Sequence, residues 1–91
     1  MLKQILVTYD LNAAGQNYAK LVDAIRSLGN CKRILQSVWV LKTDLDCNTV
    51  RNRLKTAIDA NDFIFVCEFD RWSSFMAEES NAFLLGRTAA G

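Results

Sequence analysis

The stretch Gln4-Ile5-Leu6-Val7-Thr8-Tyr9-Asp10 decides the fold, because it is an apolar run that ends abruptly in a carboxylate. A run of this length, rich in β-branched and aromatic residues and followed by Asn12 and Gly15, predicts a largely buried strand that stops at Asp10. The end of a strand is rigid but opens onto solvent, so a carboxylate there can hold a cation without complete desolvation. Asp10 is therefore the first candidate functional residue. The alternative is that it only terminates the strand and accepts backbone hydrogen bonds in the following turn.

Two later segments carry the apolar spacing of helices. Apolar residues recur on one helical face in Tyr18, Leu21, Val22, Ile25 and Leu28, and again in Val50, Leu54, Ala57 and Ile58. Gln16 or Asn17 lies near the start of the first helix, and Gly29 stands where a left-handed C-terminal cap is expected. Asp46 can cap the second helix, and Asn48 competes for that role.

Two further segments have strand character. The segment 31–41 is long for one strand, and Gln36-Ser37 interrupts it, so either one strand bends there or two short strands turn back on each other. Residues 63–69 form a nearly continuous apolar run, which predicts a central strand. The resulting order of strand, helix, strand or hairpin, helix and strand predicts an α/β sandwich with two helices on one face of a sheet.

The C-terminal segment is the least regular part of the sequence. Residues 71–76 are compatible with a short edge strand, and residues 78–85 with one or two helical turns. This segment contains several large apolar side chains that we expect to dock on the domain or on a partner subunit, namely Trp72, Phe75, Phe83 and Leu84. We therefore expect a single domain over residues 1–91, with a core over 1–70 and a docking segment over 71–91.

The composition limits the class of protein. The chain has 91 residues, of which 51% are hydrophobic and 23% charged, as expected for a compact soluble domain that a second subunit would help to stabilise. The formal net charge is +1, so any site that binds nucleic acid must be a local basic patch. No apolar run reaches the ~20 residues of a membrane span and no signal peptide is recognisable, which predicts a cytoplasmic protein without membrane contact.

The chain contains no histidine, and this excludes several kinds of active site. Ser-His-Asp and Cys-His nucleophilic sites and histidine metal centres are ruled out, which leaves carboxylate, hydroxyl, lysine or arginine chemistry. Neither GxxxxGK[ST] nor GxGxxG occurs, so a glycine-rich nucleotide loop has no support. Three widely spaced cysteines without a CxxC pair predict reduced packing residues: Cys31, Cys47 and Cys67.

Two basic pairs are candidates for phosphate contacts. Arg51 and Lys55 lie one turn apart on the outer face of the second helix, and Lys32 and Arg33 are the basic residues nearest to Gln36-Ser37. A solvated surface is the favoured interpretation of each pair, and phosphate binding is the alternative. Glu68 and Asp70 form a second carboxylate cluster at the end of the last strand. Trp39 and Trp72 are candidates for base stacking, with packing in the core or in a dimer as the alternative.

Several segments taken together resemble a known family. These are residues 6–10, the two helices, Cys31-Lys32-Arg33-Ile34-Leu35-Gln36-Ser37-Val38-Trp39, and Asp62-Phe63-Ile64-Phe65-Val66. They resemble the small CRISPR-associated subunit that partners the spacer integrase, a family that includes metal-dependent nucleases. The resemblance covers residues 4–69 and is closest to stand-alone SinR-like members, which are mostly uncharacterised. The VapD toxin ribonucleases share the same outline.

This resemblance implies a ferredoxin-like β-α-β-β-α-β fold with an antiparallel sheet, in which residues 31–41 form two strands. It also implies that the C-terminal segment adds an edge strand, either within the subunit or across the dimer. It also implies a homodimer in which Asp10 meets its counterpart and binds Mg²⁺ or Mn²⁺ for cleavage of RNA or DNA. Ser37 matches a serine that would contact phosphate or assist the reaction. The loop after Asp10 departs from the CRISPR members, which commonly carry arginines there, because it has no basic residue before Lys20. The alternatives are a non-catalytic dimeric adaptor that binds nucleic acid or a protein partner, and a toxin-antitoxin component.

Overall fold

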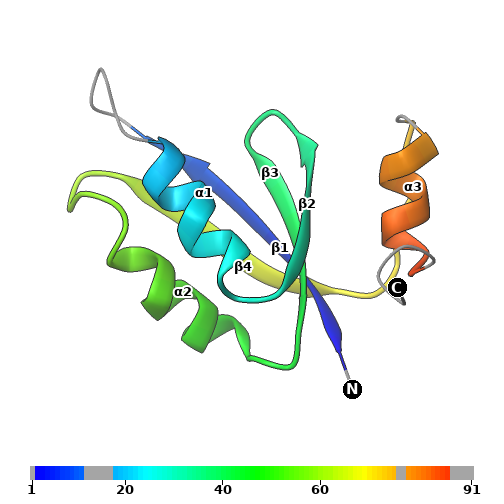
Figure 1. Cartoon of the computed structure of the whole chain (residues 1–91), viewed down its shortest axis with the longest axis horizontal. Coiled ribbons are helices and arrows are strands. Elements are labelled where there is room, and N and C mark those ends of the chain that lie inside the picture. The colour runs from blue at the N-terminus through cyan, green and yellow to red at the C-terminus, as the bar shows by residue number, and fades with distance from the viewer. Residues whose placement is uncertain (1, 12–17, 76–77, 87–91) are drawn as a thin grey trace.

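The computed structural model describes residues 2–11, 18–75 and 78–86, and it has an α+β architecture (Figure 1). It contains a four-stranded antiparallel sheet and three helices. Along the chain the elements are β1 (Lys3–Asp10), α1 (Tyr18–Arg26), β2 (Asn30–Leu35), β3 (Val38–Thr43), α2 (Cys47–Lys55), β4 (Phe63–Phe69) and α3 (Glu78–Leu84). The expected strand over residues 63–69 is therefore confirmed, although β4 lies at an edge of the sheet and not at its centre.

The strand β1 occupies the interior of the sheet, whose order is β2-β3-β1-β4. It pairs antiparallel with β3 on one side and with β4 on the other. The segment over residues 31–41 forms two strands, because the chain reverses at Gln36-Ser37 and β2 pairs antiparallel with β3. A register irregularity between Arg33 and Leu35 lies just before this turn.

The main core lies between one face of the sheet and the helices α1 and α2. Side chains of a strand alternate between the two faces, and Ile5 and Val7 of β1 point to this face. They pack with apolar residues from β3 and from both helices, namely Trp39, Leu41, Leu21, Ile25, Val50 and Leu54. This confirms the prediction of two helices on one face, and it assigns Trp39 to the core.

The helix α3 covers part of the opposite face of the sheet. Phe83 and Leu84 of α3 form a second buried cluster with Val40 of β3, and Trp72 packs against it. Residues 71–75 form no strand, so they add no edge strand to the sheet of their own subunit. The reason is that the apolar side chains of this segment dock on the face of the sheet, so its backbone does not pair along an edge. A strand that pairs across a dimer stays a prediction, and Met76 lies outside the described residues. Phe75 does not dock and is fully exposed.

Local contacts fix the ends of the helices that flank β2 and β3. Asp46 caps α2, since its Oδ1 atom accepts a hydrogen bond of 2.7 Å from the backbone N–H of Thr49. Gly29 follows α1 at a φ of +156°, far from the left-handed cap that its position suggested. A Cβ atom there would lie 2.6 Å from the carbonyl oxygen of Lys42, so glycine permits the close approach of β3. The predicted cap at Gln16 or Asn17 lies outside the described residues.

The three cysteines are found as the sequence predicts, without a disulfide among them. Cys31, Cys47 and Cys67 are free thiols and partly buried, as expected for packing residues. Burial raises the pKa of the Cys31 thiol, and the nearby charge of Arg26 partly opposes this effect. Within the described residues, no helix is long and apolar enough to cross a membrane.

Candidate functional site

Asp10 is exposed at the last position of β1, on the sheet face opposite α1 and α2. Because side chains alternate along a strand, Asp10 points to the same face as Leu6 and Thr8. Ile5 and Val7 point to the other face, into the main core. Its partner across the β1–β4 ladder is Phe63. Asp10 lines a shallow hollow of about 180 Å³ together with Thr8, Tyr9, Phe63, Ile64 and Phe65.

Ser37 belongs to a different hollow of about 370 Å³ near the same end of the sheet. Thr8 pairs with Val38, so β1 ends beside the turn that contains Ser37. The hollow around Ser37 is lined by Tyr9, Tyr18, Val22, Arg33 and Gln36. Its lining includes residues of α1, and it shares only Tyr9 with the hollow of Asp10.

The structure separates the predicted basic pair in β2. Arg33 lines the hollow of Ser37, where a guanidinium, a hydroxyl and an amide are available to an anionic group. Lys32 is opposite Val40, whose side chain belongs to the cluster beneath α3, so Lys32 lies on the other face of the sheet. Of this pair, only Arg33 is therefore placed with Ser37.

The second basic pair remains together. Arg51 and Lys55 of α2 line a hollow of about 470 Å³ beside the start of β4, with Ile58, Asp59, Ala60, Asp62, Phe63 and Ile64. Two atoms of the Arg51 guanidinium, Nη2 and Nε, donate hydrogen bonds of 3.1 and 3.3 Å to Oδ1 of Asn52. Phe63 and Ile64 also line the hollow of Asp10, so the two hollows are neighbours at the edge formed by β4.

The second carboxylate cluster lies away from Asp10. Because β1 and β4 are antiparallel, Asp10 is opposite Phe63 while Glu68 is opposite Ile5, near the other end of β1. Asp10 and Glu68 therefore lie toward opposite ends of the β1–β4 ladder. In the described part of the chain, no group of three or more His, Cys, Asp or Glu residues is placed to hold a metal ion.

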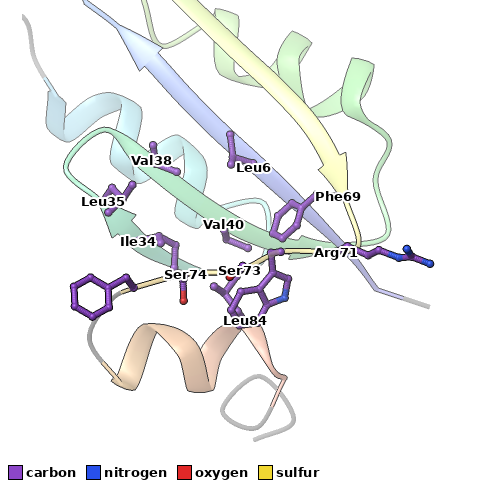
Figure 2. Close-up of a pocket in the computed structure, with 12 residues that line it drawn as sticks. Leu6, Ile34, Leu35, Val38, Val40, Phe69, Arg71, Ser73, Ser74 and Leu84 are labelled. Atoms are coloured by element: carbon purple, nitrogen blue, oxygen red, sulfur yellow. The ribbon is translucent and has the colours of Figure 1, made fainter.

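An apolar hollow of about 490 Å³ lies between the sheet and the segment that leads into α3 (Figure 2). Leu6, Val38, Val40 and Phe69 contribute to its lining from the sheet, and Leu84 from α3. Arg71 points away from the other labelled side chains in Figure 2. Of the residues singled out in the sequence, Trp72 lines this hollow, whereas Asp10, Ser37 and the two basic pairs do not.

Sequence reasoning missed four aromatic residues at these sites. Tyr9 and Tyr18 have ring centroids 5.9 Å apart and line the hollow of Ser37. Phe63 and Phe65 are exposed beside Asp10. Tyr18 had been assigned to the apolar face of a helix, although half of its surface is exposed. The alternation of Phe63 and Phe65 with Ile64 was readable in the sequence, but it does not show which sheet face the helices cover.

Comparisons with known proteins identify a solved structure with a similar fold but assign the chain to no family. No family model matches the chain, and no curated protein matches it. Among solved structures, the chain is similar to the hypothetical protein TT1823 from Thermus thermophilus, with a TM-score of 0.64 and 20% sequence identity. The match covers 85% of this chain and 93% of that protein. At this level of identity, the similarity extends to the small α+β fold alone.

Proposed function

We propose that the chain has a ferredoxin-like β-α-β-β-α-β fold and acts as a homodimeric, metal-dependent nuclease of the CRISPR-associated and VapD-like superfamily. The observation that carries this proposal is the position of Asp10, exposed at the end of an interior strand on the face that α1 and α2 leave open. The strand order β2-β3-β1-β4 supports it, because a ferredoxin-like sheet requires this order with every neighbouring pair antiparallel.

The carboxylate at this site would suffice for a divalent metal only if each of two subunits contributed its Asp10. One subunit supplies a single carboxylate at the site, whereas Mg²⁺ prefers one or two carboxylates and several waters. Asp10 and Asp10 of the partner subunit would meet this requirement, and their mutual repulsion would favour a bound cation. When bound, Mg²⁺ or Mn²⁺ supplies an activated water and stabilises charge on a phosphate.

The chain's own residues would position the substrate. The guanidinium of Arg33 is suited to a phosphate, because its planar donors match the geometry of phosphate oxygens. The hydroxyl of Ser37 lines the same hollow and would donate a hydrogen bond to that phosphate. Asp10 would hold the metal at the neighbouring hollow, and Tyr9 lines both hollows.

The test is cleavage of RNA and DNA with Mg²⁺ or Mn²⁺ and with a chelator. We expect cleavage only with the metal, abolished by Asp10→Ala and reduced by Ser37→Ala, with unchanged circular dichroism. Asp70→Ala is the matched control, since it removes an exposed carboxylate that follows the far end of β4. Cleavage without metal, or an active Asp10→Ala protein, would reject the nuclease.

A second candidate is a non-catalytic dimeric adaptor that binds nucleic acid or a protein. It is favoured by the lack of a three-ligand metal cluster among the described residues, and by the separation of Arg51 and Lys55 from Ser37. This candidate predicts salt-sensitive binding without cleavage. A toxin-antitoxin role is the third reading, and a small partner gene next to this one would favour it over a role beside a CRISPR array.

A further inference from the structure

A row of mostly apolar side chains crosses all four strands on the sheet face that α1 and α2 leave open. Successive strands pair Leu35 with Val38, Val38 with Thr8, and Thr8 with Phe65. Side chains paired in this way point to the same face. Val7, the neighbour of Thr8 in β1, points into the main core, so the row points away from α1 and α2. The row contains one hydroxyl and no charged group.

Part of this face is left uncovered by α3 as well. The buried cluster beneath α3 contains Val40, whereas Leu35 and Phe65 are exposed at the two ends of the row. Phe63, two positions before Phe65, points to the same face and is also exposed. The accessible fractions of Phe63 and Phe65 are 65% and 61%, although phenylalanine is usually buried. The exposed rings therefore indicate an interaction surface.

The apolar hollow shown in Figure 2 continues this surface beyond the row. Leu35 and Val38 line the hollow, and Phe75 lines it with a ring that is fully exposed. A whole aromatic side chain has roughly 200 Å² of surface, so Phe63, Phe65 and Phe75 together expose on the order of 450 Å². A stable interface takes about 800 Å² from each partner, so the three rings supply more than half of it.

We infer that a second copy of this chain packs on this surface, with one sheet face against the other. Two sheets stack about 10 Å apart when the side chains of both inner faces are apolar, and the row across β2, β3, β1 and β4 is such a face. A two-fold contact uses the same patch on both subunits, so the chain itself supplies the second face. This inference rests on the proposed homodimer and names the surface that forms it.

The charges fit a contact between two proteins. The cores of protein interfaces are depleted of charged residues, and the row from Leu35 to Phe65 carries none. A nucleic-acid strand needs cations along its path, and the row offers none. Asp10 brings a charge to the border of this surface, because it is paired with Phe63.

The position of Asp10 joins the interface to the proposed metal site. A two-fold axis near Phe63 places the two Asp10 carboxylates close together, and their repulsion opposes the dimer when no cation lies between them. The apolar surface therefore supplies the association, which is stronger when a divalent cation is bound. A dimer of this kind forms in chelator and tightens when Mg²⁺ is added.

The test is analytical ultracentrifugation of the chain in chelator over a range of protein concentrations. We expect a dimer, and we expect Phe65→Thr to raise its dissociation constant by at least about 10-fold, because each subunit loses the burial of a ring. Threonine keeps the preference for a strand, so the fold is retained, which circular dichroism checks. Leu85→Ser is the matched control, since Leu85 is also exposed but does not line the hollow or belong to the row.

Asp10→Asn tests the link to the metal site. At low salt in chelator, it should lower the dissociation constant by about 5-fold, the effect of removing the repulsion between two unit charges about 4 Å apart in water. Mg²⁺ should tighten the wild-type dimer and leave the Asp10→Asn dimer unchanged.

Two results would overturn the inferred surface: a wild type that stays monomeric at every concentration, and a dimer that Phe63→Thr and Phe65→Thr both leave unchanged. In the second case, cleavage that still depends on Asp10 would leave the proposed nuclease standing on another interface. A dimer that is lost in the ring variants but unaffected by Asp10→Asn would support the surface and reject the paired metal site. The failures of the two proposals are therefore distinguishable.

Discussion

The Nζ atom of Lys42 lies 5.0 Å from the centroid of the Phe83 ring, so a cation of β3 packs against an aromatic residue of α3. Only 8% of the Lys42 surface is exposed. The ring offsets part of the cost of burying the charge, because its face attracts cations. This contact ties α3 to the second face of the sheet.

The first prediction concerns pH. Burial lowers the pKa of Lys42 from its ordinary 10.5, so the unfolded chain holds this proton more tightly than the folded protein does. The free energy of unfolding of the wild type, relative to Lys42→Met, should therefore rise with pH until it levels off above 10.5. Urea unfolding of both proteins at pH 7 and pH 10 measures this difference. A difference that falls with pH would contradict the lowered pKa.

The second prediction concerns the docking of α3. Phe83 is buried against Val40, and Phe83→Ala should reduce the free energy of unfolding by about 3 to 5 kcal/mol, as in other buried sites. Leu85→Ala is the control, since Leu85 is 57% exposed and should change stability by no more than about 0.5 kcal/mol. Equal effects of the two variants in denaturant titrations would show that α3 is not docked in solution.

The third prediction concerns Gly29. Gly29→Ala should lower the free energy of unfolding by about 1 to 3 kcal/mol. The new methyl group would overlap the backbone carbonyl of Lys42, which cannot move without shifting β3. Gly86→Ala is the comparison. Its φ of +85° is also unfavourable for alanine, but the nearest atom, Nζ of Lys42, would be at an ordinary contact distance of 3.7 Å. We expect the larger loss of thermal stability for Gly29→Ala, and the reverse order would contradict this account.

The fourth prediction concerns the cap of α2. The hydrogen bond from the backbone of Thr49 lowers the pKa of the Asp46 carboxyl below its ordinary 3.8. A lowered carboxyl pKa stabilises the fold above pH 3.8 and ceases to do so as the pH falls through the folded value. Asp46→Asn keeps a capping oxygen without the charge and should be less harmful than Asp46→Ala. Thermal melts at pH 7 should rank the three proteins, and the advantage of aspartate over asparagine should vanish in strong acid.

The sequence predicted the helices and strands better than it predicted which surfaces they pack against. The spacing of apolar residues identified both helices of the main core. Asp46 was one of two candidates for the N-cap of α2, and it is the residue that caps the helix. The position of α3 was not readable, because periodicity does not say which surface a short helix will cover. Residues 71–75 were compatible with an edge strand but form none, because large apolar residues such as Trp72 suit either a strand or an extended segment docked on a sheet.

The candidate site was only partly predictable. Asp10 was found because a carboxylate at the end of an apolar strand is a local signal. The grouping of Arg33 with Ser37 and the separation of Lys32 depend on which face of β2 each side chain occupies. The exposure of Phe63 and Phe65 depends on the surface that α1, α2 and α3 leave uncovered. Both properties arise from tertiary packing, which local spacing does not encode.

The interior position of β1 also determines when the protein can fold. β1 is made first on the ribosome, yet its two neighbours are β3, over residues 38–43, and β4, over residues 63–69. The backbone groups on one edge of β1 therefore remain unpaired until residues 63–69 have been synthesised. Contacts this distant in sequence slow folding, because the chain must close long loops before they form. The four-stranded sheet is therefore completed only when β4 pairs with β1, and α3 can pack on the sheet only after that.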